Sequence, residues 1–194
     1  KDMYQKTVPV RPRDWPRNLS DFRAEKEPTD AQTAQFLTEL NQARSPVMVI
    51  GPAVRQNGAH DVMVELARKM QVPVVTTLSD IAAFPNTDPL FLGVVGTAGH
   101  PSAHRYINEQ ADLVVAVGSH LEIMQRAPII SGLERARLLV INEETELARN
   151  TFPTASTIEC DLAEFADSLI SKSMALPVGS GCPVGYQQQE YSPT

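Results

Sequence analysis

The amino-acid sequence predicts an α/β fold, in which helices cover both faces of a six-stranded parallel sheet. Short runs of apolar residues recur along the chain, and they lack the polar alternation of a half-exposed strand. Such runs are typical of strands that are buried on both faces. Several of them are separated by segments whose apolar residues recur at helical spacing. Strands that alternate with helices favour a parallel sheet.

Six apolar runs are interpreted as strands. The clearest is 112–118, in which an aspartate is followed by an unbroken apolar stretch and then by glycine. Each run is short, as expected for a strand, and is bounded by glycine, proline or polar residues. No internal repeat is visible. The predicted strands are 46–51, 72–78, 91–96, 112–118, 137–142 and 157–160.

Four segments are predicted to be helices from their caps and their apolar spacing. The first follows Thr29 and the last follows Asp161, two residue types that accept hydrogen bonds from the free amides of a first helical turn. A third helix is predicted over 101–110. The apolar residues expected to face the sheet are Phe36, Leu37 and Leu40; Val62, Leu66 and Met70; and Leu162, Phe165, Ala166, Leu169 and Ile170.

The two ends of the chain are interpreted as connecting segments. Residues 1–28 are polar and contain four prolines, each of which removes a backbone donor and restricts the residue before it. Residues 176–194 are rich in glycine, proline and glutamine. We therefore predict a linker from a preceding domain over 1–28, one domain over 29–175, and a linker or tail over 176–194. The first residue is not methionine, which suggests a piece of a longer protein.

Composition and charge exclude several classes of function. The chain has 194 residues and a net charge of −6, whereas a protein that binds a phosphate backbone is expected to carry a basic patch. No run of about 18 apolar residues is present, so no membrane-spanning helix is predicted. Cys160 and Cys182 are too few for a disulfide framework. We therefore expect neither nucleic acid nor membrane as a partner, and we expect a reducing, cytoplasmic setting.

Candidate binding residues follow the strands, because ligands of open parallel sheets bind beyond the carboxyl ends of the strands. Small residues dominate these loops and bring a ligand close to backbone amides that can donate to phosphate oxygens. A tight turn explains any single loop equally well, but several such loops at one edge favour a nucleotide-like ligand. The loops are Gly51, Pro52 and Ala53; Thr76, Thr77 and Leu78; Gly96, Thr97, Ala98, Gly99 and His100; Gly118, Ser119 and His120; and Asn142, Glu143 and Glu144.

No catalytic or metal-binding set is predicted. The first loop lacks the G-x-G-x-x-G fingerprint of dinucleotide-binding folds, and Pro52 has no amide hydrogen to donate. Ser119 and His120 are not part of a nucleophile elbow. The four histidines lie at no spacing that brings in a second strong metal ligand, so surface or capping roles are favoured for them. Cys160 follows an apolar run and is interpreted as a buried packing thiol.

Four stretches of the sequence resemble the central domain of thiamine-diphosphate-dependent enzymes of the acetolactate synthase and pyruvate oxidase group. The second and third of them, in this order and spacing, are the specific part of the resemblance. Similarity extends from about Gln35 to Met174, and residues 1–5 resemble the exit from the preceding pyrimidine-binding domain. The four stretches are SPVMVIG at 45–51, VPVVTTL at 72–78, FPNTDPLFLG at 84–93 and ADLVVAVG at 111–118.

The resemblance implies a Rossmann-like fold, similar to NAD- and FAD-binding domains, within a three-domain enzyme that acts on 2-keto acids. In this family the flanking pyrimidine- and diphosphate-binding domains hold thiamine diphosphate and Mg²⁺, and the latter domain carries a Gly-Asp-Gly motif that this sequence lacks. The resemblance therefore implies a central domain that is not catalytic alone. It also implies a parent enzyme that forms a homo-oligomer and catalyses carboligation or decarboxylation.

Some family members hold FAD or ADP in this domain. Flavin-binding members typically have three glycines where this chain has Gly51-Pro52-Ala53. Those members usually also have an arginine in the loop that corresponds to the one after Gly118. Around Glu143 they usually have an Asp-Ile-Asp sequence, which this chain lacks. We therefore predict weak or absent FAD binding, with ADP as the alternative ligand. The family pattern places the contacts on Gly51, Thr77, Leu78, Gly96, Thr97, Ala98, Gly118, Ser119, His120 and Glu143.

Two other functions remain as alternatives. A stand-alone nucleotide-binding or scaffold module of the same fold would need no flanking domains. An open reading frame that runs on into a Gly-Asp-Gly motif would argue against it. A sirtuin-like NAD-dependent deacylase would need a Gly-Ala-Gly loop, a Gln-Asn-x-Asp sequence and a catalytic histidine, and this set is absent from the sequence.

Overall fold

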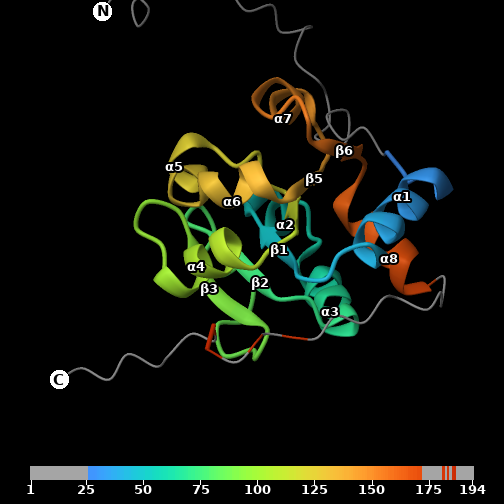
Figure 1. Cartoon of the computed structure of the whole chain (residues 1–194). Helices are drawn as coiled ribbons and strands as arrows, with labels where there is room; N and C mark the ends of the chain where they lie inside the picture. Colours follow the sequence, from blue (N-terminus) through green and yellow to red (C-terminus); the bar gives the residue numbers. More distant parts are fainter. Residues whose placement is uncertain (1–25, 172–180, 182, 184, 187–194) are drawn as a thin grey trace, which may run out of the picture.

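The computed structural model describes residues 26–171, 181, 183, 185 and 186 of the chain. Six strands form one sheet in the order β3-β2-β1-β4-β5-β6, and every neighbouring pair is parallel (Figure 1). This confirms the predicted α/β fold. The strands are β1 (Pro46–Ile50), β2 (Val74–Thr77), β3 (Phe91–Val95), β4 (Leu113–Val117), β5 (Arg137–Asn142) and β6 (Ser156–Glu159).

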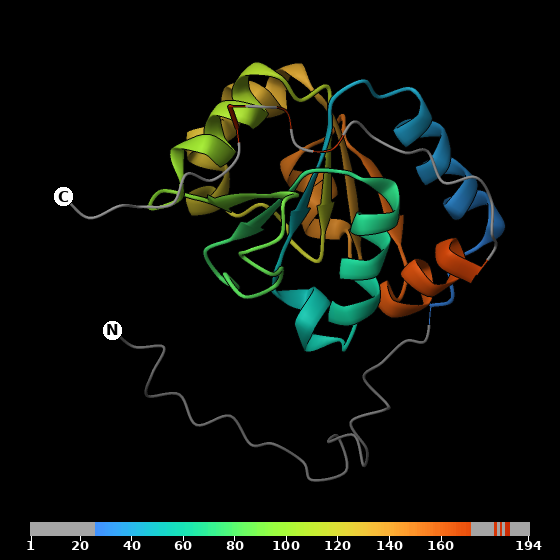
Figure 2. The ribbon, with the colours of Figure 1, turned by 90° about the horizontal axis from the view of Figure 1, so that it is seen from below.

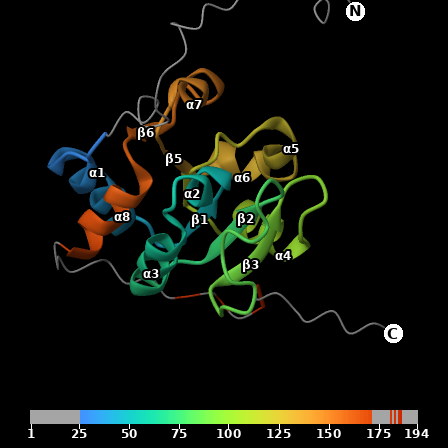
Figure 3. The same cartoon turned by 180° about the vertical axis from the view of Figure 1, so that it is seen from behind.

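Helices cover both faces of the sheet, as Figures 1 and 3 show from opposite sides. One layer contains α1 (Asp30–Asn41), α2 (Pro52–Gln56), α3 (His60–Met70) and α8 (Leu162–Ser171). The other contains α4 (Pro101–Glu109), α6 (Ile130–Arg135) and α7 (Glu146–Thr151). Between β4 and α6 lie α5 (Ile123–Arg126) and the 3₁₀ helix η4 (Ala127–Ile129).

The predicted helices α1, α3, α4 and α8 are present, but several shorter ones were missed by sequence reasoning. The missed elements are α2, α5, η4, α6 and α7, which have three to six residues each. A segment of that length makes fewer than two helical turns, so its apolar residues cannot show a period.

The sheet separates two apolar clusters, because successive side chains of a strand point to opposite faces. In β1, Met48 and Ile50 belong to the cluster beneath α1, α3 and α8, whereas Val47 and Val49 belong to the cluster beneath α4 and α6. All five residues of β1 are buried, as predicted for a central strand of a parallel sheet. Both helical layers are therefore held by the burial of apolar surface against a shared sheet.

The predicted helix caps are also present. The Thr29 side chain accepts a hydrogen bond from the amide of Gln32, whose side chain in turn accepts one from the Thr29 amide. Oδ1 of Asp161 accepts from the amides of Ala163 and Glu164 at 2.8 and 2.9 Å. Cys160 is buried as predicted, and burial raises the pKa of its thiol to about 12. These features follow from local sequence alone.

The predicted linkers lie largely outside the described residues. Residues 26–28 have no regular secondary structure, and neither do the described residues among 181–186 apart from a turn. Residues 1–25, 172–180, 182, 184 and 187–194 are outside the described part of the chain, so the predicted boundaries of the domain remain predictions. Among the described residues, no helix is long and apolar enough to cross a membrane.

Candidate functional site

A crevice opens at the carboxyl edge of the sheet, where the order of the strands reverses. From β1 the chain continues to β2 and β3 on one side, and β4 to β6 lie on the other. The loops after β1 and β4 therefore part at this point, which is where open α/β sheets bind ligands. The crevice has a volume of about 300 Å³. It is lined by Lys26, Pro52, Ala53, Gln56, Ser79, Gly118, Ser119, His120, Glu122, Gln125, Asn142, Glu143 and Glu144.

The structure divides the residues predicted from the sequence into two groups, and Thr77 belongs to neither. Gly118, Ser119, His120 and Glu143 line the crevice. Gly51 lies directly behind it, because a Cβ atom placed there would be 2.4 Å from the carbonyl oxygen of Gly118. These five residues form the crevice group.

The remaining predicted residues are elsewhere. Thr77 is fully buried in β2 and does not line the crevice. Leu78, Thr97 and Ala98 form an exposed group beside α5, next to the buried Gly96. A Cβ atom on Gly96 would lie 2.6 Å from Cδ1 of Leu78, and the Thr97 amide donates to the carbonyl of Met124 at 2.9 Å.

Five residues that line the crevice had not been considered as candidates, and one of them, Glu122, is the N-cap of α5. Ser79 lies one position beyond the strand-end residues that were inspected, and Gln56 and Gln125 lie in the unpredicted helices α2 and α5. Lys26 comes from the segment interpreted as a linker. A wider window after β2 would have found Ser79. No sequence signal indicates Lys26, because tertiary folding alone brings it to this edge.

The floor of the crevice is a chain of paired polar side chains. Oγ of Ser119 donates to Oε1 of Gln125 at 2.9 Å, and Nε2 of Gln125 donates to Oγ of Ser79 at 3.0 Å. Ser119 and Gln125 are both buried. Burial without partners would be costly for these groups, so the pairing fixes their orientation. The floor is rigid, and its hydrogen-bonding capacity is largely used within the protein.

His120 differs from the rest of the floor. Its Nε2 atom lies 3.3 Å from Nδ2 of Asn142, whose Oδ1 accepts from the amide of Glu143 at 3.0 Å. Nε2 therefore accepts a hydrogen bond, and the proton of the neutral ring lies on Nδ1. Nδ1 is buried and has no hydrogen-bond partner among the described residues. A water molecule or a ligand acceptor in the crevice would satisfy it.

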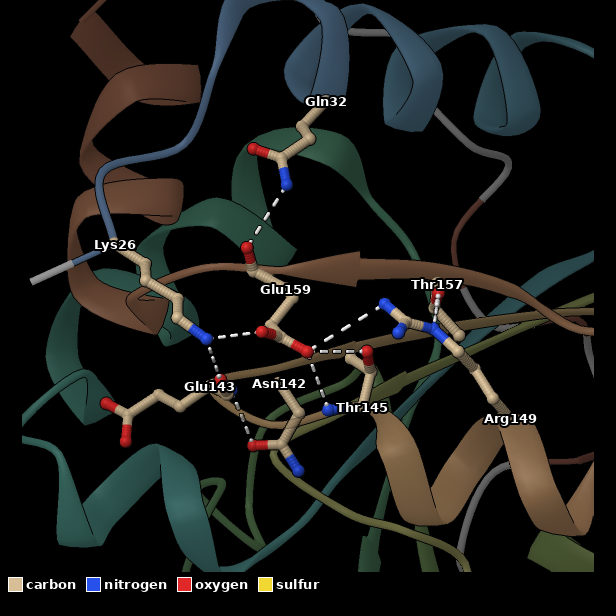
Figure 4. A network of polar contacts seen from close by, with 8 residues as sticks. All are labelled: Lys26, Gln32, Asn142, Glu143, Thr145, Arg149, Thr157 and Glu159. Atoms are coloured by element: carbon tan, nitrogen blue, oxygen red, sulfur yellow. Dashed lines mark hydrogen bonds and ion pairs between the residues drawn. The ribbon is translucent and has the colours of Figure 1, made fainter. Parts of the chain in front are cut away.

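The only cation on the wall, among the described residues, is the ammonium of Lys26, and it is already paired (Figure 4). It contacts Oε1 of Glu159 and lies 3.5 Å from the carbonyl oxygen of Glu143. The other oxygen of Glu159 accepts hydrogen bonds from the amide and the hydroxyl of Thr145 at 3.1 and 2.9 Å. The hydrogen bond from Lys26, followed by those from Thr145, lowers the pKa of Glu159 to about 2. Glu159 is thus charged at neutral pH and holds Lys26.

The crevice does not fit the diphosphate of FAD or ADP. The Gly51 amide donates to the carbonyl of Val117 at 2.8 Å, and the Ala53 amide donates to that of Gly118 at 3.1 Å. Pro52 has no amide hydrogen. The donors that a dinucleotide fold aims at phosphate oxygens are therefore bonded to the neighbouring loop instead. The crevice is also lined by the acidic residues Glu122, Glu143 and Glu144.

The two histidines near the exposed group have structural roles. The ring of His100 accepts a hydrogen bond from the Ser102 amide and caps α4, as the capping interpretation predicted. Nε2 of His104 accepts from the Gly96 amide at 3.3 Å. Burial lowers the pKa of His104. Within the described part of the chain, no three histidine, cysteine or acidic residues are placed to hold a metal ion.

Comparison with known proteins identifies the domain. A family model described as "Thiamine pyrophosphate enzyme, central domain" matches residues 33–169. The chain belongs to this family. The match confirms the resemblance seen in the sequence and covers the sheet and both helical layers. The name of the family implies thiamine diphosphate as the cofactor of its members.

Acetolactate synthases are among the relatives of this chain. The large subunit from Lactococcus lactis is 31% identical over 105 residues, which are 54% of this chain and 18% of that protein. The large subunit from Parasynechococcus marenigrum is 31% identical over 130 residues, 66% of this chain and 21% of that protein. Chloroplastic acetolactate synthase 1 from Zea mays is 30% identical over 163 residues, 80% of this chain and 24% of that protein. The chain thus spans about a fifth of the length of these relatives.

A solved structure shares the fold. The X-ray structure described as that of a thiamin diphosphate-dependent enzyme from Mycobacterium smegmatis aligns with a TM-score of 0.64. The alignment covers 88% of this chain and 32% of the other, at 24% sequence identity. The described residues therefore have the architecture of one domain within a larger chain of that fold.

Proposed function

We propose that this chain is the non-catalytic central domain of a thiamine-diphosphate-dependent enzyme that acts on 2-keto acids. The parent enzyme would catalyse carboligation or decarboxylation of the acetolactate synthase kind. The observation that carries the proposal is that polar side chains at the carboxyl edge of the sheet are hydrogen-bonded to one another. α/β enzymes have their reactive groups at this edge. Here Ser119 is bonded to Gln125, and Lys26 is bonded to Glu159. The partner of the Ser119 hydroxyl is an amide and not a base, so it does not activate the hydroxyl for attack on a substrate.

The remaining features of the parent follow from this proposal. Thiamine diphosphate and Mg²⁺ would be held by the flanking pyrimidine- and diphosphate-binding domains, and the central domain would position those two partners. We propose a homo-oligomeric, cytoplasmic parent. The relatives named acetolactate synthase support the type of reaction, because the cofactor carries the difficult chemistry and the protein supplies binding and orientation.

A nucleotide-binding module of the same fold is the second candidate, and two observations favour it. The crevice lies where the strand order reverses, and Nδ1 of His120 has no partner among the described residues. FAD and ADP would nevertheless bind weakly, because the Gly51 and Ala53 amides donate within the protein. A hydrogen bond to a charged group contributes about 1.5–3 kcal/mol. The loss of two such bonds weakens binding by roughly 10² to 10⁴.

Activity measurements test the first candidate. The purified chain, supplied with pyruvate, thiamine diphosphate and Mg²⁺, should form neither acetolactate nor carbon dioxide. A gene product that contains this chain together with its neighbouring sequence should do so under the same conditions. Turnover by the chain alone would contradict the non-catalytic role.

Calorimetric titration with FAD and with ADP tests the second candidate. We expect no binding of either below about 10 μM, since the lost bonds remove most of the diphosphate affinity. Adenosine, which has no phosphate, is the matched control and should bind no more weakly than ADP. Sub-micromolar FAD binding, or purification as a yellow protein, would show that the internal hydrogen bonds open for a ligand.

A further inference from the structure

The last described residues pack against the folded domain, although they form no helix or strand. The Gly181 amide donates to the carbonyl of Gln71 at 3.1 Å, and Gln71 caps the C-terminal end of α3. Tyr186 lies on α4, in the other helical layer. The C-terminal ends of helices that precede parallel strands lie at the amino edge of the sheet. The described residues among 181–186 thus contact both layers at the amino edge of the sheet, opposite the crevice, and Figure 2 shows this end of the chain beside α4.

Tyr186 is bound through both its ring and its hydroxyl. Its ring meets that of Tyr106 edge to face, with centroids 5.4 Å apart, and the guanidinium of Arg105 lies 4.7 Å from its centroid. Its hydroxyl donates to Oε2 of Glu109 at 2.9 Å and accepts from Nε2 of Gln110 at 3.1 Å. Arg105 and Tyr106 lie one helical turn before Glu109 and the C-cap Gln110, so the four partners share one face of α4. Edge-to-face and cation–π contacts stabilise aromatic side chains by about 1 kcal/mol each.

The backbone before Tyr186 is shaped to present it. The Tyr186 amide donates to the carbonyl of Pro183 at 3.2 Å, which closes a turn. Gly185 in this turn has a φ of +95°, in the left-handed region that favours glycine. The Arg105 side chain also contacts the carbonyl of Gly185. One arginine therefore binds both the ring and the turn that carries it.

We propose that the described residues Gly181, Pro183, Gly185 and Tyr186 form a strap that ties the two helical layers together across the amino edge of the sheet. In this proposal Arg105, Tyr106, Glu109 and Gln110 form a tyrosine-binding surface, and Tyr186 is its occupant. The strap lies beyond residue 169, where the family match ends, and beyond residue 175, the predicted end of the domain. The folded unit then extends to Tyr186, and whatever follows in the chain begins over α4.

Hydrogen exchange combined with thermal unfolding of the 194-residue chain tests the proposal. Tyr186→Ala should lower Tm by roughly 6 °C and allow the Gly181 amide to exchange at the rate of an unstructured peptide. Tyr186→Phe keeps the ring contacts, so it should lower Tm by about half as much and leave Gly181 protected. The proposal would be overturned by an unchanged Tm in Tyr186→Ala. It would also be overturned by a Gly181 amide that exchanges freely in the unsubstituted 194-residue chain.

A double-mutant cycle tests recognition of the hydroxyl by α4. Glu109→Ala and Tyr186→Phe each remove the same hydrogen bond. The double variant should therefore unfold at nearly the Tm of the less stable of the two single variants. Glu134→Ala, at an exposed glutamate of the neighbouring α6, is the matched control and should add its small effect independently. Additive shifts for Glu109 and Tyr186 would show that α4 does not recognise the hydroxyl.

Discussion

The two groups of predicted binding residues lie in different environments, although the sequence presents them alike. Both loops contain a glycine with positive φ, Gly118 at +65° and Gly96 at +131°. The loop after β4 is built into the protein, since the carbonyl of Gly118 accepts from the Ala53 amide. The loop after β3 is bonded internally as well, through the Gly96 and Thr97 amides, but it lies beneath exposed apolar side chains, with Leu78 39% and Met124 59% accessible. A small-residue turn therefore does not reveal whether its backbone is free for a ligand.

The largest difference is expected for alanine substitutions of the glycines. Gly51→Ala places a Cβ atom against the backbone of Gly118, which cannot move aside without breaking the hydrogen bonds between the two loops. We expect a loss of about 3 kcal/mol in the free energy of unfolding. Gly96→Ala should cost about 2 kcal/mol, because its new atom meets the flexible end of Leu78 and the main penalty is conformational.

Urea unfolding measures both, and Gly58→Ala is the control for backbone strain alone. Gly58 has a φ of +71° with nothing within 4 Å of its Cβ position, so about 1 kcal/mol is expected. Equal losses at positions 51 and 58 would mean that the loops after β1 and β4 separate easily, and the crevice could then open for a ligand.

Removal of the buried glutamine in the crevice floor should have the next largest effect. Gln125→Ala leaves the hydroxyls of Ser119 and Ser79 without their shared partner, and we expect a loss of about 2 kcal/mol in unfolding free energy. Gln56→Ala removes an exposed glutamine from the wall of the same crevice and should change stability by less than about 0.5 kcal/mol. Similar losses for the two variants would contradict a rigid, internally paired floor.

The Lys26–Glu159 pair should contribute less, and in a pH-dependent way. The pKa of Glu159 falls from 4.5 to about 2 in the folded protein, so the charged carboxylate stabilises the fold above pH 4.5. Glu159→Gln should therefore cost about 1 kcal/mol at pH 7. The difference from the parent chain should shrink as the pH falls from about 4.5 towards 2, where Glu159 becomes protonated in both states. Denaturant unfolding at pH 7, 4 and 3 measures this, and a constant difference would show that the ion pair is not its source.

The exposed side chains of α5, beside the loop after β3, should tolerate substitution best. Met124→Gln changes a side chain that is mostly accessible, while the carbonyl that binds Thr97 stays in place. A change of less than about 0.5 kcal/mol in unfolding free energy is expected. A loss above about 1 kcal/mol would mean that the region beside α5 depends on this side chain, and the contrast with the crevice would disappear.

Much of the fold could be predicted because it depends on short-range patterns. The unbroken apolar run that became β4 needs only its own residues to indicate a strand with two buried faces. Thr29 and Asp161 mark helix starts through bonds to amides two or three positions away. The short helix α5 escaped prediction for the converse reason. Its four residues show no period, and its position depends on what it packs against.

The candidate site could be predicted only in outline. The rule that ligands bind at the carboxyl ends of strands selected the edge of the sheet at which the crevice lies, and eight of the residues in the selected loops line the crevice. It could not distinguish Gly118 from Gly96, because both follow apolar strands and both have small neighbours. Whether a backbone amide is free depends on the neighbouring loop.

The sequence by itself determined the parallel sheet, the four longer helices, the caps of the first and the last of them, and the family. Each of these depends on residues that lie close together along the chain or on stretches shared with relatives. The tertiary structure alone decided that Lys26 reaches Glu159, that Gln125 meets Ser79, and that the hydroxyl of Tyr186 meets Glu109. These partners are 133, 46 and 77 positions apart in the chain. Contacts over such separations form only when apolar burial has brought the strands and helices together. Local sequence patterns therefore do not predict them.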